Sequence, residues 1–272
     1  AEDMFADLMQ ITKTNMSTDD ISQIKHLLTL INPKNITPSE LIGFVNYANK
    51  HMVSIKPNKP TLDIVGTGGD GKNTVNISTA ASLLTASLGI PTAKHGARSN
   101  SSKSGSADLM EALGYDLMQD PAKTLEQINN TNFGFCFAPL YHPSFKGVKD
   151  IRRELKTQTI FNLIGPLINP AHAEYRIIGV ADPNHLNLFA KTLQQTAKST
   201  LKKAVVVHCQ GCDELNTIGK SQIIEVTSDK LFEYILDPKD YGFKEAKLED
   251  LQGDDAKSNL DLIMQVFKGK QS

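Results

Sequence analysis

The chain has 272 residues, 40% of them hydrophobic, and its 29 basic and 30 acidic side chains give a net charge of −1. This length accommodates one large domain or a large and a small one. The near-neutral charge argues against nonspecific nucleic-acid binding, and no apolar run is long enough to span a bilayer. Three cysteines cannot form a disulfide framework, which is typical of a protein in a reducing cytoplasm. From the charge, the apolar runs and the cysteines together, we expect a cytoplasmic protein that binds neither nucleic acid nor membrane.

The first 60 residues have helical patterning without strand patterns. Ser17–Asp20 and Thr37–Glu40 are helix-start signals, and the second is a capping box with Pro38 at the first helical position. Pro57–Pro60 then breaks the helix and is expected to act as a linker. We therefore predict a small all-helical N-terminal domain over residues 1–60.

From Leu62 onward, strand patterns alternate with helix patterns. Such alternation predicts an α/β domain over residues 61–272, with a mainly parallel sheet and helices on both faces. The predicted strands are Leu62–Val65, Pro91–Ala93, Phe133–Phe137, Tyr175–Val180 and Ala204–His208, with helices near 79–88, 106–113, 121–130, 144–155 and 183–198. Gln222–Val226 and Lys230–Ile235 are predicted to form an antiparallel hairpin on this sheet.

A glycine-rich segment, Gly66–Gly71, follows the first predicted strand and precedes a helix start at Asn76–Thr79. Glycines let the backbone turn tightly and come close to a ligand. Exposed N–H groups and the positive end of the next helix suit a phosphate or pyrophosphate. The segment has neither the Gly-Lys-Ser/Thr of a Walker loop nor the downstream acid of a dinucleotide fingerprint.

A second anion-binding turn lies roughly thirty residues further along the chain. It contains Lys94, His95 and Arg98, followed by a hydroxyl-rich stretch over Ser99–Ser106. Two such turns imply a ligand with several phosphate oxygens.

Taken together and in this order, the motifs resemble the anthranilate phosphoribosyltransferases of tryptophan biosynthesis, over nearly everything from about residue 38 onward. The matching segments are Gly66–Gly71, Asn76–Thr79, Lys94–Arg98, Lys103–Asp108, His142-Pro143, Arg152–Leu155, Thr159–Pro170 and Asp213-Glu214. The resemblance implies a Mg²⁺-dependent glycosyltransferase. It would transfer the phosphoribosyl group of phosphoribosyl pyrophosphate (PRPP) to the amine of anthranilate, releasing pyrophosphate. It also implies a homodimer that pairs through the small helical domain.

The same resemblance implies a set of substrate-binding residues. They are Gly66, Thr67, Gly68, Gly69, Asp70, Asn76, Ser78, Thr79, Lys94, Ala97, Ser106, His142 and Arg152. The pyrophosphate would lie on the glycine loop, where Asp70 holds the ribose hydroxyls or the shape of the loop. Ser78 and Thr79 are expected both to cap the following helix and to contact phosphate.

Magnesium is expected because the leaving group carries several negative charges. Asp213 and Glu214 follow the strand Ala204–His208, at the edge where open α/β sheets bind ligands. The resemblance implies that this pair binds one metal ion and that Ser78 is a ligand of a second. Two Mg²⁺ ions are therefore predicted.

Arg152 is expected to bind the carboxylate of the aromatic acceptor, since a guanidinium pairs with a carboxylate through two bonds. Lys94 and Arg152 are therefore the predicted catalytic residues. His142 either borders the acceptor pocket or only packs at a helix start, and both readings stay open. Arg153 and Glu154 are interpreted as a surface or interdomain pair. No catalytic base is assigned, because the amine of anthranilate is poorly basic.

Three features depart from the family pattern or lie outside it. Ala97 stands where the family has an asparagine that helps to hold the acceptor, so we expect weaker anthranilate binding or a different acceptor. The family continues past residues 254–260 into further helices, so the α/β domain is expected to lack C-terminal helices. Cys209 and Cys212 are interpreted as buried strand-end residues rather than zinc ligands, with the hypothesis that their oxidation distorts the adjacent metal turn.

Two alternatives stay open at this stage. One is an enzyme like the pyrimidine nucleoside phosphorylases, which have a related glycine-rich loop, although Asp70 and the run Asn76–Thr79 favour the transferase. The other is a degenerate paralogue that binds nucleic acid or a ligand without catalysis.

Overall fold

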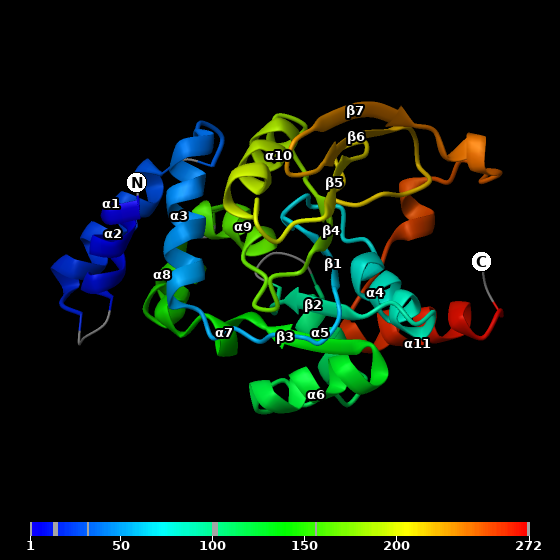
Figure 1. Ribbon diagram of the computed structural model, residues 1–272, viewed down its shortest axis with the longest axis horizontal. Coiled ribbons are helices and arrows are strands. Elements are labelled where there is room, and N and C mark those ends of the chain that lie inside the picture. The colour runs from blue at the N-terminus through cyan, green and yellow to red at the C-terminus, as the bar shows by residue number, and fades with distance from the viewer. Residues whose placement is uncertain (1, 13–15, 32, 100–102, 156, 271–272) are drawn as a thin grey trace.

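A computed structural model of the protein describes residues 2–12, 16–31, 33–99, 103–155 and 157–270. Seven strands form one sheet in the order β3-β2-β1-β4-β5-β6-β7 (Figure 1). The strands are β1 (Leu62–Gly66), β2 (Thr92–Gly96), β3 (Phe133–Phe137), β4 (Tyr175–Gly179), β5 (Lys203–His208), β6 (Ser221–Val226) and β7 (Leu231–Leu236). Strands β1–β5 are parallel, and the β6–β7 hairpin joins them antiparallel to β5. The mainly parallel sheet and the hairpin are therefore confirmed.

Helices cover both faces of this sheet (Figure 1). They are α1 (Glu2–Ile11), α2 (Thr18–Leu30), α3 (Pro38–His51), α4 (Ile77–Ser87), α5 (Ser106–Ala112), α6 (Pro121–Thr131), α7 (Ala138–Tyr141), α8 (Lys149–Leu155), α9 (Ile160–Ile164), α10 (His185–Thr196) and α11 (Ala256–Phe267). Helix α10 packs on β5 and β6, whereas α4 packs on β1 and β2 and α11 lies against α5. None of the described helices is both long and apolar enough to cross a membrane.

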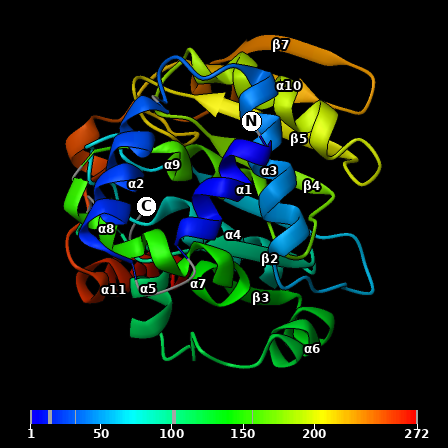
Figure 2. The same cartoon turned by 90° about the vertical axis from the view of Figure 1, so that its left-hand side faces the viewer.

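The N-terminal helices α1–α3 form a purely helical unit beside the sheet, together with α8 (Figure 2). Both predicted helix starts are present, and each has a capping box, at Ser17 with Asp20 and at Thr37 with Glu40, of which only the second was predicted. The ring of Phe5 in α1 lies 4.7 Å from that of Phe44 and 5.7 Å from that of Phe161 in α9. One hydrophobic core therefore runs from the N-terminal helices into the helices that cover the sheet.

Several predicted elements differ from the observed ones. The predicted strand Pro91–Ala93 continues to Gly96, so Lys94 and His95 belong to β2 rather than to a turn. The predicted helix 144–155 is a 3₁₀ segment over Pro143–Val148 followed by the short helix α8. The helices α7 and α9 were not predicted, because five residues or fewer carry no periodic signal. Helix α11 was also missed.

The strand order reverses between β1 and β4. Strands β2 and β3 lie on one side of this pair, and β5, β6 and β7 lie on the other. In open α/β sheets the crevice beyond the carboxyl ends of such strands is the usual place for a ligand. The glycine loop begins there, directly after β1.

Candidate active site

A cavity of about 310 Å³ opens at the carboxyl ends of the central strands. It is lined by Gly66, Thr67, Gly68, Gly69, Asp70, Asn76, Ser78, Thr79, Lys94, Ala97, Ser106, Arg152, Asp213 and Glu214. Every predicted site residue except His142 is therefore brought to one cavity. Residues 100–102 of the hydroxyl-rich stretch lie outside the described residues.

The glycine loop is shaped by both conformation and crowding. Gly68 and Gly69 have φ values of 66° and 75°, which disfavour other residues. Gly66 and Gly179 are partners in the β1–β4 register, and a Cβ on either would overlap Asp213. These two strand ends therefore need glycine because the Asp213 turn lies across them. The loop in turn holds Asp213, since the Gly68 N–H donates to its Oδ2 at 2.6 Å.

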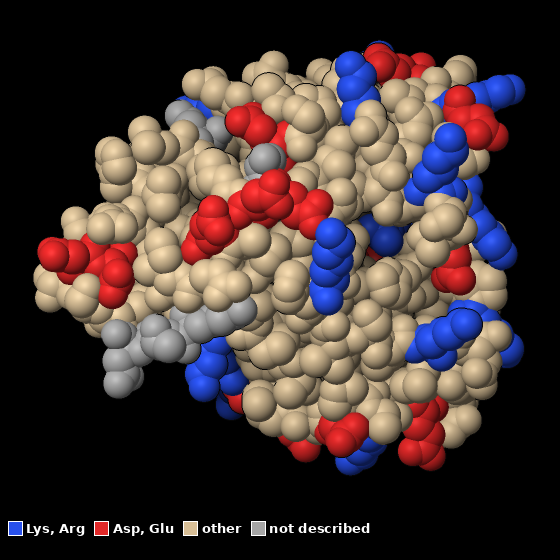
Figure 3. Space-filling model, turned by 60° about the vertical axis from the view of Figure 1, so that its left-hand side comes forward, with Lys and Arg blue, Asp and Glu red and all other residues tan. Residues whose placement is uncertain are grey.

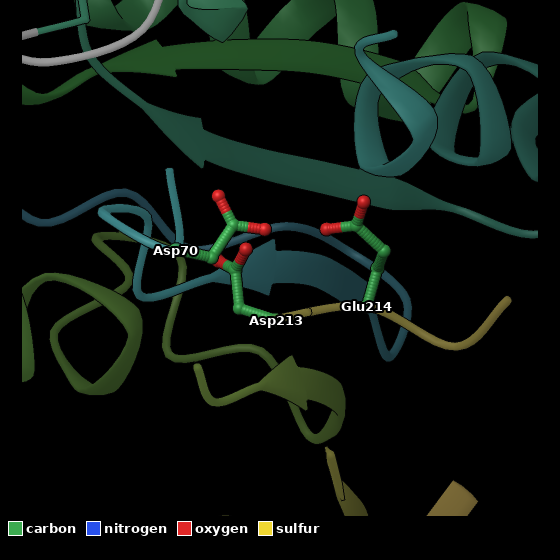
Figure 4. A group of neighbouring side chains, drawn as sticks. All are labelled: Asp70, Asp213 and Glu214. Atoms are coloured by element: carbon green, nitrogen blue, oxygen red, sulfur yellow. The ribbon is translucent and has the colours of Figure 1, made fainter. Parts of the chain in front are cut away.

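Three carboxylates meet at one end of the cavity. Asp70, Asp213 and Glu214 each place an oxygen so that the three atoms lie within 4.8 Å of one another (Figure 4). Burial raises the pKa of both Asp213 and Glu214, and the nearby acids raise both further. Thr74 donates to Glu214 at 2.6 Å. A divalent cation would relieve this repulsion, and hard oxygen ligands suit Mg²⁺.

Asp70 was not predicted as a metal ligand. Its Oδ1 accepts a bond from the Lys72 N–H at 3.1 Å, which supports the predicted role in loop shape. Its Oδ2 is buried without a hydrogen-bond partner among the described residues. That oxygen is therefore left for a ligand or cation.

Lys94 is fully buried beneath the cavity floor. Its Nζ donates to the Ile64 carbonyl at 2.7 Å and to Ser78 Oγ at 3.3 Å. Burial lowers the pKa of Lys94 to about 8, against an opposing attraction from the buried Asp63. A lysine has three donors, so one N–H is left for an anionic substrate.

We expect Lys94→Met to raise the KM for PRPP about tenfold to a hundredfold, since a hydrogen bond to a charged group contributes about 1.5–3 kcal/mol. The apoprotein should also melt lower than the wild type, because the buried Asp63 carboxylate loses the positive charge of Lys94 beside it. Steady-state kinetics and thermal melting measure the two effects. An unchanged KM for PRPP in the folded variant would mean that Lys94 is mainly structural.

The start of α4 differs from the prediction for Ser78 and Thr79. The N-cap residue is Asn76, and its side chain makes no cap bond. Ser78 and Thr79 lie inside the first turn of α4, so neither is the helix cap. Thr79 Oγ1 is buried without a hydrogen-bond partner in the described part of the chain. The capping half of that prediction was wrong, and the hydroxyl is left to serve a ligand.

Arg152, Phe161 and His95 form an aromatic and cationic wall of the cavity. Arg152 stacks over Phe161, with its guanidinium carbon 4.6 Å from the ring centroid. Burial lowers the pKa of Arg152 to about 10. His95 lines the cavity. His142 does not line it, but its ring lies 5.0 Å from that of His95. Burial lowers the pKa of His95 to about 4 and that of His142 as well, so this wall holds neutral imidazoles.

Other charged residues of the motifs make structural contacts. Arg98 forms ion pairs with Asp108 and Glu111 of α5, which occupy its guanidinium. Glu154 pairs with Lys25 of α2 at 2.6 Å, and Arg153 pairs with Asp150. Arg153 and Glu154 therefore pair with other residues rather than with each other, and their interpretation as an interdomain pair stays a prediction.

Sequence reasoning missed several residues that line the cavity. They are His95, which was placed in the second anion-binding turn but given no role in the site, and Phe161, Asn162, Gly165 and Pro166. The last four lie in the quoted motif Thr159–Pro170, which was the available signal, but no single residue in it was assigned. Gln158, just before this motif, also holds the glycine loop, since its Nε2 donates to the Gly69 carbonyl at 3.1 Å.

Cys209 and Cys212 are both buried and face each other across an isolated antiparallel bridge. Burial raises the pKa of both thiols. This agrees with their interpretation as small buried residues at a strand end. The effect of their oxidation on the Asp213 turn stays a hypothesis.

Charged side chains of both signs are mixed on one face of the molecule (Figure 3). Among the described residues on the face drawn in Figure 3, lysines and arginines are scattered between acidic side chains rather than gathered into one basic band. The face drawn in Figure 3 therefore has no basic band of the kind that binds a nucleic-acid backbone.

Comparisons with known proteins agree with this geometry. Residues 58–272 match the family model described as "Glycosyl transferase family, a/b domain". The chain is 41% identical to an anthranilate phosphoribosyltransferase of Chlamydia felis over 261 residues, which cover 96% of this chain and 76% of the relative. It resembles the crystal structure of the enzyme of that name from Thermus thermophilus, with a TM-score of 0.88 and 36% identity over 100% of this chain and 78% of the other. A Saccharomyces cerevisiae anthranilate phosphoribosyltransferase in complex with PRPP and Mg has a TM-score of 0.85 and 26% identity, over 95% of this chain and 73% of that one.

Proposed function

The chain belongs to the anthranilate phosphoribosyltransferase family, and from this premise we propose how its residues carry out the reaction. The protein is a glycosyltransferase that transfers the phosphoribosyl group of PRPP to anthranilate and releases pyrophosphate. The relatives favour this activity over the phosphorylase-like and non-catalytic alternatives. The observation that carries the residue assignment is the convergence of the glycine loop, three carboxylates and Arg152 on one cavity.

For PRPP, we assign the diphosphate to the backbone N–H groups of the glycine loop and to the first turn of α4. Positive-φ glycines and a helix N-terminus together make a site suited to anions. Thr79 Oγ1 and one N–H of Lys94 are additional donors supported by their burial and unused bonding capacity. Ser106 is assigned to the same phosphates because it lines the cavity at the start of α5.

Mg²⁺ is the metal of the family, as the yeast complex indicates. We assign one ion to Asp213 and Glu214 with Asp70 beside them, and a second to Ser78. When bound, the ions would neutralise charge on the pyrophosphate leaving group. The carboxylates would hold the metal, and the glycine loop fixes Asp213 through the Gly68 N–H.

For anthranilate, we assign the carboxylate to Arg152 and the ring to the wall formed by Phe161 and His95. The guanidinium is held in place by its stacking on Phe161, and its planar donors match a carboxylate. The neutral imidazoles of His95 and His142 keep this wall suited to an aromatic ring. Catalysis would then depend mainly on positioning and charge neutralisation.

Ala97 is exposed at the cavity wall, where its short side chain offers no hydrogen bond. Restoring the family residue in Ala97→Asn should lower the KM for anthranilate about fivefold, because one neutral hydrogen bond contributes about 1 kcal/mol. The KM for PRPP should stay within twofold of the wild type, which serves as the internal control. An unchanged anthranilate KM would show that Ala97 does not limit acceptor binding.

The activity itself is tested by following loss of anthranilate fluorescence with PRPP and Mg²⁺ present. We expect turnover that requires both additions and stops when EDTA removes the metal. Folded protein that binds PRPP with Mg²⁺ but consumes no anthranilate would point to a different acceptor.

We further propose the division into a helical domain over residues 1–60 and an α/β domain over residues 61–272. A homodimer that pairs through the helical domain is proposed from the family resemblance, and sedimentation velocity would test it. A cytoplasmic location is proposed from the biosynthetic activity of the relatives.

A further inference from the structure

Residues 251–253, which lead into α11, pair with the segment just before α4, which lines the cavity. The two segments are far apart in the sequence. The Val75 N–H donates to the Leu251 carbonyl at 2.9 Å, and the Gly253 N–H donates to the Asn73 carbonyl at 2.8 Å. Thr74 and Gln252 form an antiparallel bridge between these contacts. The chain just before α4 is thus paired with residues 251–253 along its backbone.

Asn259, in the first turns of α11, is buried and has a fixed side-chain orientation. Its Oδ1 accepts a bond from the Asp254 N–H at 2.7 Å, and its Nδ2 donates to the Asp254 carbonyl at 3.3 Å. A backbone N–H can only donate and a backbone carbonyl can only accept. These two partners therefore fix which atom of the Asn259 amide is the oxygen and which is the nitrogen. Asn259 can therefore present only an N–H to its remaining neighbour.

That neighbour is Asn76, the residue before α4. Asn259 Nδ2 donates to Asn76 Oδ1 at 3.0 Å. The same Oδ1 accepts from Ser104 Oγ at 3.2 Å, and Asn76 Nδ2 donates to the Ser104 carbonyl at 3.1 Å. Both lone pairs of Oδ1 and one N–H are thereby used. One N–H of the Asn76 amide is left, at a residue that lines the cavity.

We propose that Asn259 is a positioning residue for PRPP, acting through Asn76. The bond from Asn259 turns the Asn76 oxygen away and leaves an amide N–H for a phosphate oxygen of the substrate. Through Asn76 it also sets the position of Ser104, which belongs to the second anion-binding segment. The proposal rests on the proposed contact between Asn76 and PRPP, and it makes Asn259 of α11 a working part of the site.

The test is a double-mutant cycle read by the KM values for the two substrates. Asn259→Ala should raise the KM for PRPP about tenfold and leave the KM for anthranilate within twofold. Asn76→Ala should have a similar effect, and the double variant should be no worse than Asn76→Ala alone. Asn259→Asp keeps the acceptor for Asp254 but cannot donate to Asn76, so it should match Asn259→Ala in the wild-type background and have no effect in the Asn76→Ala background.

Asp255→Ala is the matched structural control. Asp255 caps α11 by accepting from the Ser258 N–H at 2.8 Å, and its side chain has no contact with Asn76 among those that the structure records. It should lower the melting temperature without changing the KM for PRPP.

Three results would count against these ideas, and they are distinguishable. If Asn76→Ala leaves the KM for PRPP unchanged, the proposed contact of Asn76 with PRPP is wrong. If Asn76→Ala raises it but Asn259→Ala and Asn259→Asp do not, Asn259 has no positioning role. If the Asn259 variants act equally in both backgrounds, or if Asp255→Ala has the same effect, α11 contributes only general stability or charge.

Discussion

Asp213→Asn and Glu214→Gln should each lower kcat/KM about a hundredfold or more and raise the Mg²⁺ concentration needed for half-maximal activity. The reason is electrostatic: two largely buried carboxylates with raised pKa values lie beside Asp70, and a cation would relieve their repulsion. Removing a preorganised charge that stabilises a transition state costs about a hundredfold or more. Steady-state kinetics over a Mg²⁺ titration measures the effect.

These two substitutions are close to isosteric, so folding should be preserved. The amide oxygen of the introduced asparagine can still accept from Gly68, and that of the introduced glutamine can still accept from Thr74. The apoproteins should melt no lower than the wild type, because one repelling charge is gone. Glu233→Gln, on the exposed side of β7, is the control with an equal charge change. Wild-type activity in either site variant would show that the substituted carboxylate has no role in the reaction.

Gly179→Ala should destabilise the protein by about 3 kcal/mol or more and abolish activity. A Cβ at this position would overlap the Asp213 backbone oxygen, and backbone at the end of β4 cannot move aside as a flexible side chain could. For a chain of this size that corresponds to a fall in melting temperature of about 10 °C. Thermal unfolding followed by calorimetry would measure it.

Gly165→Ala is the matched control for stability, because a Cβ there meets nothing within 4 Å and its φ is −46°. That variant should melt close to the wild type. If Gly179→Ala had a melting temperature equally close to that of the wild type and kept Mg²⁺-dependent activity, the close contact of the Asp213 turn with the ends of β1 and β4 would not constrain the site.

Local signals in the sequence were sufficient for much of the fold. The capping box at Thr37 and the strand Phe133–Phe137 were predicted at or close to their observed bounds, because each depends on neighbours within a few residues. The 3₁₀ segment at Pro143–Val148 was not predicted. A Cβ at Gly147 within it would overlap the Thr12 backbone, so its shape depends on a contact with the distant N-terminal unit.

In the site, too, features set by neighbouring residues were predicted, whereas those set by distant contacts were not. The residues of the glycine loop were found from their local pattern, yet the reason for Gly66 is its approach to Asp213, 147 positions later. Asn76 was expected at a helix start, but its side chain is held by Asn259 instead of capping α4. Asp70 was assigned to the loop, and only the folded chain places it beside Asp213 and Glu214. Each of these contacts depends on register between distant segments.

Calorimetric titration of PRPP into the folded protein, with Mg²⁺ and then with EDTA, tests the central claim most directly. Binding should be measurable with Mg²⁺, should fall below detection in EDTA, and should be lost in the Asp213→Asn, Glu214→Gln double variant even with Mg²⁺ present. Equal PRPP affinity with and without the metal, or unchanged binding by the double variant, would contradict a metal-assisted diphosphate site at the carboxyl end of β1.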